Sequence, residues 1–187
     1  GRDTAELSAA EVARATVESL AENASDAVVA PLLWGAVAGL PGLLGYRAAN
    51  TLDAMIGHRS PRYRKFGWAA ARLDDLANWV PARVAALAAA AWAPLVGGTA
   101  AKTVNVVRRD ASQHPSPNAG VVEAAFAGAL DVRLGGHNCY KGAIEDRGLL
   151  GDGRVVEIAD IARASRLAAA VSITALAVAV LFRGRRS

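Results

Sequence analysis

The sequence AVVAPLLWGAVAGLPGLLGY, residues 27–46, continues for 20 residues without a charged side chain. An α-helix rises about 1.5 Å per residue, so about 20 residues cross a hydrocarbon core of roughly 30 Å. The stretch is therefore long enough to span a membrane as one helix. A helix buried inside a soluble, alanine-rich bundle would have the same composition, and one such run does not separate these alternatives.

Two further charge-free runs lie downstream. Residues 84–101 read VAALAAAAWAPLVGGTAA, and residues 167–182 read LAAAVSITALAVAVLF. The third run is followed by Arg183, Arg185 and Arg186, which is typical of a span that ends at the cytoplasmic side. Three such runs in 187 residues favour a membrane protein over a soluble bundle, and we expect a multi-pass protein of the cell membrane.

Prolines and glycines interrupt the first two runs. An interior proline removes a backbone hydrogen bond and kinks a helix, and broken helices occur at membrane depth where they face protein or line a cavity. We therefore expect the first or the second run to be broken or re-entrant. The interrupting residues are Pro31, Gly35, Gly39, Pro41, Gly42 and Gly45 in the first run, and Pro94, Gly97 and Gly98 in the second. Lysines and arginines are balanced around three full spans, which leaves the orientation open.

The composition excludes several classes of protein. A single cysteine excludes a disulfide framework and a zinc site built from cysteines alone. The net charge of +4 is spread along the chain, so we expect no nucleic-acid partner. The first residues are polar and acidic, so we expect no signal peptide. Residues 1–187 are interpreted as a single membrane-embedded domain.

Helix signals also occur outside the apolar runs. Residues 4–26 are predicted to form an amphipathic helix, with Ser8 and Glu11 as a capping box near its start. The pattern predicts an all-α integral membrane protein, in which amphipathic and broken or re-entrant helices are joined by polar loops.

Two shorter helices and a turn-rich segment complete the prediction. One helix is expected at residues 66–79, ended by Pro81, and another at residues 120–130. Residues 131–160 are rich in glycine and turns, and strand signals are weak throughout the chain.

The first polar cluster precedes the first apolar run. Glu18, Glu22 and Asp26 are four residues apart and share one stripe of a helix. Like charges at this spacing destabilise a helix, so they need a cation, an arginine or water. One interpretation is a site for Mg²⁺, which prefers oxygen ligands and would hold a phosphate. The other is a solvated acidic face, which the spacing alone favours.

The second polar cluster consists of Asn50, Asp53, Arg72, Asp74, Asp75, Asn78 and Arg83. On a helix, Asp74 and Asn78 share one face, and Arg72 and Asp75 share the adjoining face. Carboxylates with an amide can hold Mg²⁺ against phosphate, and Arg72 and Arg83 can pair with phosphate. An ordinary interfacial helix with internal ion pairs is equally compatible with this pattern.

The third polar cluster consists of Arg108, Arg109, Asp110, His114, Ser116 and Asn118. Prolines fix an extended backbone that presents His114, Ser116 and Asn118. Asn118 is expected to cap the helix at residues 120–130, whose N-terminus is a natural anion site. His114 is a candidate general acid or base. The alternative is a capped turn in which His114 is merely hydrogen-bonded.

Three long strings of this sequence resemble one known family. They are VESLAENASDAVVAPL, YRAANTLDAMIGHRSPRYRKFGWAAARLDDLANWVPAR and RRDASQHPSPNAGVVEAAFAGAL. The strings resemble the CobD/CbiB family, the adenosylcobinamide-phosphate synthases of cobalamin biosynthesis, and the resemblance extends over about residues 1–168. Members of that family are integral membrane proteins with additional N-terminal membrane segments. The resemblance therefore implies that this chain corresponds to the C-terminal portion of such a protein.

The resemblance implies an ATP-dependent amide ligase. Such an enzyme joins a carboxylate of cobyric acid to (R)-1-amino-2-propanol phosphate, or to the free aminopropanol in some pathways. The implied cofactors are ATP and Mg²⁺, and the implied partners are the corrinoid, the aminoalcohol and membrane lipid. A non-catalytic regulatory or scaffold protein of the membrane, from the same family group, is the alternative.

Amide formation requires an activated carboxylate, usually an acyl phosphate, and phosphoryl transfer needs a metal and cationic groups. We accordingly assign the polar residues to three roles. The predicted metal ligands are Glu18, Glu22, Asp26, Asp74, Asp75 and Asn78. The predicted substrate and phosphate contacts are Arg72, Arg83, Arg108, Arg109, Ser116 and Asn118. The predicted catalytic residues are Asp74, Asp75 and His114, with His114 as the acceptor of the amine proton. A shared site requires the first two clusters to meet, which favours a break in an apolar run.

Overall fold

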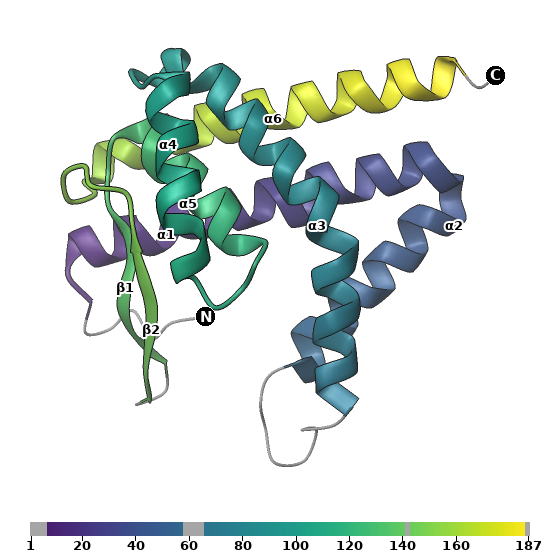
Figure 1. Cartoon of the computed structure of the whole chain (residues 1–187), viewed down its shortest axis with the longest axis horizontal. Helices are drawn as coiled ribbons and strands as arrows, with labels where there is room; N and C mark the ends of the chain where they lie inside the picture. Colours follow the sequence, from purple (N-terminus) through teal and green to yellow (C-terminus); the bar gives the residue numbers. More distant parts are fainter. Residues whose placement is uncertain (1–6, 58–65, 141–142, 186–187) are drawn as a thin grey trace.

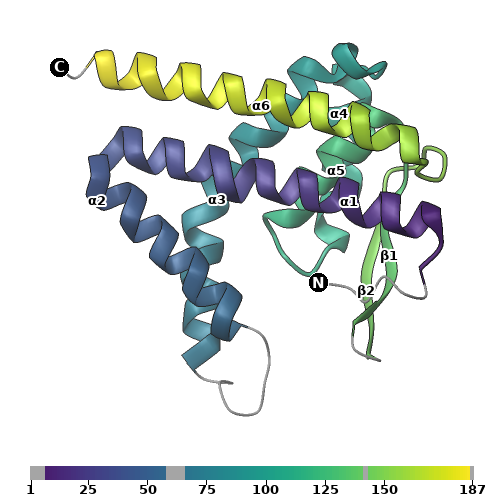
Figure 2. The same ribbon diagram turned by 180° about the vertical axis from the view of Figure 1, so that it is seen from behind.

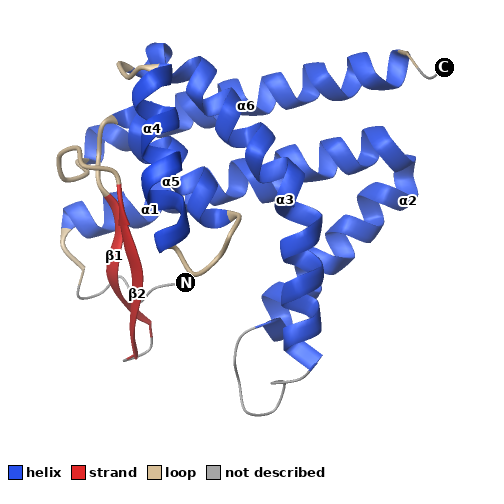
Figure 3. Cartoon of the chain, viewed as in Figure 1, coloured by secondary structure: helices blue, strands red, loops and turns tan. Residues whose placement is uncertain are grey.

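The computed structural model describes residues 7–57, 66–140 and 143–185, and these are mainly helical (Figure 3). The long helices are α1 (Ala9–Asn23), α2 (Ala30–Leu52), α3 (Phe66–Trp92), α4 (Ala100–Asp110), α5 (Ala119–Leu130) and α6 (Ile158–Gly184). Short helical turns of π or 3-10 type cover Ala24–Val29, Asp53–Gly57, Ala93–Val96 and Ala111–Gln113. Strands β1 (Leu134–Tyr140) and β2 (Ala143–Leu150) form an antiparallel pair. The predicted helical fold class is confirmed.

Three helical segments in the described part of the chain are long and apolar enough to cross a membrane. They are Ala9–Gly57, Gly67–Val96 and Ile158–Gly184. Large apolar side chains are exposed along the outer parts of two of these segments, including Leu40 and Leu44 of α2 and Val180 and Leu181 of α6. Exposed apolar surface of this extent suits lipid rather than water. The composition of the helices thus agrees with the predicted membrane protein.

The first apolar run is broken at Gly39, as predicted. Gly39 has φ 66° and ψ −153°, which are not helical angles, and Pro41 follows it. The chain then turns back: both views show the second half of α2 leaving the direction of α1 and descending beside α3 (Figures 1 and 2). The turn is tight, because a Cβ atom at Gly42 would clash with the carbonyl oxygen of Trp34. Glycine is therefore required at both positions.

The predicted end of a helix at Pro81 is wrong. α3 continues through Pro81 to Trp92 as one helix of 27 residues. A proline cannot donate to the carbonyl four residues earlier, here that of Ala77. The indole nitrogen of Trp34 donates to that oxygen instead, at 3.0 Å. A side chain from α2 thus supplies the hydrogen bond that the proline removes.

The second apolar run is also broken. α3 ends at Trp92, and a 3-10 turn over Ala93–Val96 leads to Gly97, which has φ 85°. The hydroxyl of Thr99 then accepts from the amide of Lys102 and begins α4. Residues 84–101 therefore belong to two helices rather than to one span.

The ends of the other helices agree with the sequence in part. α1 begins with the predicted capping box, in which Ser8 and Glu11 bond each other's backbone amides. Residues 4–6 of that predicted helix lie outside the described residues. α5 forms where it was expected, at Ala119–Leu130. The hairpin of β1 and β2 was not predicted, because glycines at positive φ interrupt its pattern, among them Gly135 and Gly148.

The core surrounds α5, whose residues from Val122 to Leu130 are all buried. α5 packs against α1, α3 and α4, and α6 lies along α1 (Figure 1). Fully buried side chains in this core include Val17, Phe126 and Leu167. The α2–α3 hairpin extends from one side of the core (Figure 1), and Tyr46 of α2 contacts the backbone of Asp26, just before the start of α2.

Candidate functional site

The first two polar clusters meet at Tyr46. Its hydroxyl lies 2.9 Å from the backbone oxygen of Asp26 and 2.9 Å from Oδ1 of Asn78. Tyr46 and Asn78 are both buried. The turn at Gly39 brings Tyr46 back beside Asp26, and α3 supplies Asn78 from the other side. The predicted junction between the two clusters is therefore formed, and a broken run forms it.

Asp74 is held at this junction by two amides. Asn50 Nδ2 donates to Asp74 Oδ1 at 3.1 Å, and Asn78 Nδ2 donates to Oδ2 at 3.0 Å. Asp26 lies close enough to interact electrostatically with Asp74 and Asp53. Three carboxyl groups from three helical segments thus repel one another here, and a cation would relieve that repulsion. Asp26 also lies in the π-helical turn, a feature that is frequent at functional sites.

The arrangement fits a magnesium ion only if water and substrate supply most of the metal ligands. Within the described ranges, no three His, Cys, Asp or Glu side chains lie close enough together to enclose a metal. Mg²⁺ usually takes one or two protein carboxylates and fills its other positions with water and substrate phosphate. Asp26 and Asp74, which interact electrostatically, are the candidate carboxylates for such an ion, and each oxygen of Asp74 retains a lone pair after accepting one amide hydrogen. An ion held by protein groups alone does not fit.

Glu18 and Glu22 lie beside other groups. Glu18 is buried and accepts from the backbone amide of Gly135 at 2.8 Å, next to Arg14. Glu22 is 38% exposed, and its Oε1 lies 3.6 Å from Arg147 Nη1. Both carboxylates therefore have cationic or amide neighbours from α1 and the hairpin. Only Asp26, of the three predicted acids on this stripe, lies with Asp74.

Arg83 joins the second cluster to the third. Its guanidinium lies over the ring of Trp79 and donates to Asn118 Oδ1 at 2.9 Å. Asn118 Nδ2 in turn donates to the backbone oxygen of Asp75 at 2.8 Å. Arg83, Asp75 and Asn118 are therefore linked by hydrogen bonds along one edge of the candidate site. Arg72 lies on the outer side of α3, with its side chain 64% exposed and 3.5 Å from Asp75.

The predicted cap of α5 by Asn118 is wrong. In the described part of the chain, the Asn118 side chain makes no capping hydrogen bond. The hydroxyl of Ser116 accepts from the amides of Asn118 and Ala119, at 3.4 and 3.2 Å. Asn118 instead spans Arg83 and Asp75, so its amide group is no longer directed at the helix end. Ser116 is therefore a capping residue, a role that its sequence position also allows.

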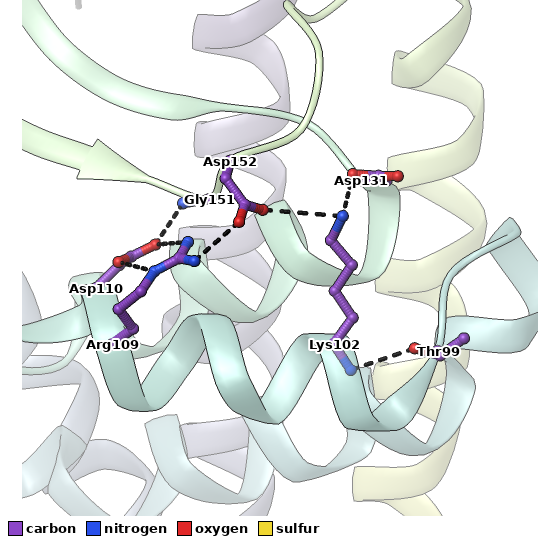
Figure 4. Close-up of polar contacts among 7 residues, drawn as sticks. All are labelled: Thr99, Lys102, Arg109, Asp110, Asp131, Gly151 and Asp152. Carbon is purple, nitrogen blue, oxygen red and sulfur yellow. Dashed lines mark hydrogen bonds and ion pairs between the residues drawn. The ribbon is translucent and has the colours of Figure 1, made fainter.

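Arg109 is engaged in a network away from the junction (Figure 4). It donates to both oxygens of Asp110, at 2.7 and 2.8 Å, and to Asp152 at 2.8 Å. The hydrogen bond from Arg109 holds the pKa of Asp110 below its usual range. Lys102 bonds Asp131 at 2.6 Å, and the Asp131 carboxylate raises the pKa of Lys102.

This network fastens α4 to the loop after β2, because Asp110 also accepts from the amide of Gly151 at 2.8 Å. Arg109 therefore has partners that hold α4 to this loop, whereas Arg108 is exposed on α4. The two arginines are not brought to the junction of the first two clusters.

His114 and Glu123 form a buried pair at the other end of the third cluster. Nε2 of His114 lies 3.5 Å from Oε1 of Glu123, and the two side chains are 3% and 0% exposed. The amide of Ser116 donates to Nδ1 at 3.0 Å, so the ring carries its proton on Nε2 in this arrangement. Burial, together with the nearby charges of Glu22 and Glu18, raises the pKa of Glu123 well above its ordinary value.

Comparison with known proteins shows the family. The family described as "CobD/Cbib protein" matches residues 1–168. This chain belongs to the CobD/CbiB family. A relative named "Cobalamin biosynthesis protein CobD" from Mycobacterium tuberculosis is 57% identical over 186 residues, which is 100% of this chain and 59% of the relative.

Other CobD/CbiB proteins match at similar identity. A protein of the same name from Rhodobacter capsulatus is 58% identical over 75% of this chain and 43% of its own length. One from Sinorhizobium fredii is 54% identical over 86% of this chain and 50% of its own length. The chain thus spans about three fifths, or less, of these relatives. No solved structure matches.

The sequence assignments missed three residues that lie beside members of the predicted polar clusters, namely Tyr46, Arg147 and Glu123. Tyr46 lies inside the apolar run, where a tyrosine is unremarkable until its partners are known. Arg147 lies in a strand that was not predicted. Glu123 carried a usable signal, because it is the sole charged residue among residues 119–130. A carboxylate in the middle of a buried helix is expected to have a specific role.

Proposed function

We propose that this CobD/CbiB chain carries the catalytic part of an ATP-dependent amide ligase of cobalamin biosynthesis. The reaction joins a carboxylate of cobyric acid to (R)-1-amino-2-propanol phosphate or to aminopropanol. The observation that carries the proposal is the junction of Asp26 and Asp74 through Tyr46 and Asn78; the guanidinium of Arg83 lies further along α3, where Asn118 links it to the backbone of Asp75. Phosphoryl chemistry needs both kinds of group.

In this proposal, the residues have the following roles. Asp26 and Asp74 would hold Mg²⁺, which when bound supplies positive charge to phosphate oxygens. Arg83 is positioned by Trp79 and Asn118 to neutralise a further phosphate charge. Asn50 and Asn78 keep both Asp74 oxygens directed at the junction. The buried Tyr46 hydroxyl fixes the π-helical turn that carries Asp26.

Membrane embedding is part of the same proposal. We propose a multi-pass protein of the cell membrane, with lipid against the exposed apolar faces of α2 and α6. The corrinoid and the aminoalcohol then approach the polar edge formed by α3 and the loop before α5. Charged groups beside apolar helices are favoured where they face protein or water rather than lipid.

The test uses the full-length protein in membranes or detergent. It is incubated with ATP, Mg²⁺, cobyric acid and aminopropanol phosphate or aminopropanol, and amide product is measured. Asp74→Asn removes a charge and is expected to lower kcat at least about 100-fold, in the range typical of lost electrostatic stabilisation. Asp152→Asn, in the network of Figure 4, is the matched control and is expected to remain active.

A wild-type protein that forms no amide with either aminoalcohol would contradict the proposal. So would a strain lacking the gene that grows equally well on cobyric acid and on cobinamide. Either result would favour the regulatory or scaffold alternative.

A further inference from the structure

One face of α3 presents a row of large apolar side chains to the outside of the molecule. Another face of the same helix packs on the core, where Asn78, Ala82 and Ala85 are buried. The outward residues recur every three or four positions, which is the spacing of one helix face. We call them the α3 stripe, and its members are Trp68, Leu73, Leu76, Trp79, Val80 and Leu87. Leu76 is 75% exposed, and apolar surface of this extent marks a place of contact with a partner.

Two arginines accompany the tryptophans of the α3 stripe. The guanidinium carbon of Arg72 lies 5.9 Å from the ring centroid of Trp68, and that of Arg83 lies 4.6 Å from the ring centroid of Trp79. In each pair the arginine follows the tryptophan by four residues. The second pair repeats the first after 11 residues, which is about three helical turns, so both pairs lie on the same side of α3.

The charge on the outward side of α3 is positive. Asp74 and Asp75 are the only acids in residues 67–92, and Asn50 and Asn78 hold Asp74 at the junction. Asp75 is 27% exposed, compared with 64% for Arg72, and 3.5 Å separates their charged groups. A guanidinium has five N–H donors, so this long contact leaves Arg72 able to bind a second anion. An apolar face with tryptophans and exposed positive charge complements a phospholipid surface.

The repeat of the tryptophan–arginine pair indicates how α3 lies in the membrane. Tryptophan favours the headgroup level of a bilayer, and an arginine in the hydrocarbon is costly. If α3 crossed the membrane, the two pairs would differ in depth by about 16 Å, since a helix rises about 1.5 Å per residue. Both pairs reach the headgroup level together only if α3 lies along the surface. Figures 1 and 2 agree, because α3 descends across the direction in which α6 and the first half of α2 extend.

We propose that the α3 stripe lies in the plane of the bilayer surface and binds phospholipid. Its aliphatic side chains contact acyl chains, its tryptophans lie at the headgroups, and Arg72 binds lipid phosphate. Residues 67–96, although long enough to cross, therefore do not cross. The inference rests on the proposed membrane embedding but not on the amide ligation. Arg83, which Asn118 holds, stays with the candidate site, and that site then opens at the membrane surface.

The first measurement is the depth of α3 in vesicles that contain the full-length protein. Single spin labels replace exposed residues in Ala69→Cys, Leu76→Cys and Leu87→Cys, without other cysteines, and collisions with oxygen and with a nickel chelate give the depth of each label. We expect all three labels at about 5–10 Å, at the boundary of headgroups and acyl chains. The controls Ile173→Cys and Val180→Cys, exposed on α6, are expected to differ in depth by about 10 Å.

A steady change in depth from residue 69 to residue 87, approaching the roughly 27 Å of a helix along the membrane normal, would overturn the proposal. Labels on α3 that neither oxygen nor nickel reaches would show that protein covers the stripe, and this result would also overturn it. Labels on both α3 and α6 that nickel reaches freely would contradict the membrane embedding itself. The two kinds of failure are therefore distinguishable, and neither measurement depends on amide synthesis.

The second measurement tests lipid phosphate as the anion. The full-length protein is reconstituted in phosphatidylcholine with increasing brominated phosphatidylglycerol, whose binding quenches tryptophan fluorescence. Arg72→Gln is expected to weaken phosphatidylglycerol binding about fivefold, which corresponds to about 1 kcal/mol for one arginine near the surface. Arg133→Gln, an exposed control after α5, is expected to bind as the wild type does. Unchanged lipid binding in Arg72→Gln, together with weaker binding of ATP and Mg²⁺, would assign Arg72 to the substrate and refute its lipid role.

Discussion

The hydrogen bond between Trp34 and the carbonyl of Ala77 allows a quantitative test of how α3 tolerates Pro81. Trp34→Phe removes the indole donor at 3.0 Å and leaves the Ala77 oxygen with neither a helical nor a side-chain partner. This oxygen is partly buried, so leaving it without a donor costs about 1 kcal/mol, the lower end of the range for a buried acceptor. For a chain of this length, each kcal/mol lowers Tm by roughly 2–4 °C. We therefore expect Trp34→Phe to lower Tm by at least about 2 °C.

The control is the same substitution in a Pro81→Ala background. Alanine at position 81 restores the backbone N–H that donates to Ala77, so the indole is no longer required. A double-mutant cycle of thermal unfolding in detergent is expected to give a coupling of about 1 kcal/mol between Trp34 and Pro81. The packing lost with the indole ring is common to both backgrounds and cancels. Equal costs of Trp34→Phe in the two backgrounds would refute the reasoning.

Three further predictions follow from single contacts. Gly39→Ala is expected to destabilise the fold by about 1–2 kcal/mol, because Gly39 has a positive φ. Gly45→Ala is expected to stabilise the fold by about 0.5–1 kcal/mol, because a Cβ atom there meets no atom within 4 Å. Chemical unfolding of both variants measures these changes. Asp160→Asn is expected to cost about 3 kcal/mol, since Arg154 and Arg163 bond this buried carboxylate and would lose its charge; unfolding at low and high salt measures the loss. The raised pKa of Glu123 predicts that stability falls as pH rises from the ordinary glutamate pKa towards the raised value, by up to about 1.4 kcal/mol per pH unit, because the folded state holds the proton more tightly than the unfolded chain. Glu123→Gln is expected to flatten this pH dependence in a series of Tm measurements. An unchanged pH dependence of Tm in the variant would contradict the raised pKa of Glu123.

The sequence predicted the apolar helices and the breaks within them, because both depend on local composition. Gly39 and Pro41 disrupt a helix wherever it is placed, and the structure has the break there. Pro81 shows the limit of the same rule, because its effect was cancelled by Trp34, a residue 47 positions away. The hairpin escaped prediction for a related reason. Its strands are held by pairing with each other and by Glu18, which bonds Gly135 from α1.

In the candidate site, too, the local spacing of residues was predicted, but their partners from distant parts of the chain were not. Glu18, Glu22 and Asp26 were predicted to share one helical stripe as metal ligands or as a solvated acidic face, but neighbours from other elements decide the surroundings of each acid. Arg147 approaches Glu22, and Gly135 approaches Glu18, both from an unpredicted hairpin. Arg109 was interpreted as a phosphate contact, yet Asp152, distant in sequence, completes its ion pairs.

The reversal at Gly39 changes what a charge-free run of 20 residues means for this chain. A hydropathy count assigns one crossing to the run and puts its two flanks in different compartments. The folded chain instead brings the Tyr46 hydroxyl back to within 2.9 Å of the backbone oxygen of Asp26, so the two flanks of the run lie side by side. Residues that a count of apolar positions would separate by the width of a membrane are therefore neighbours in the folded chain.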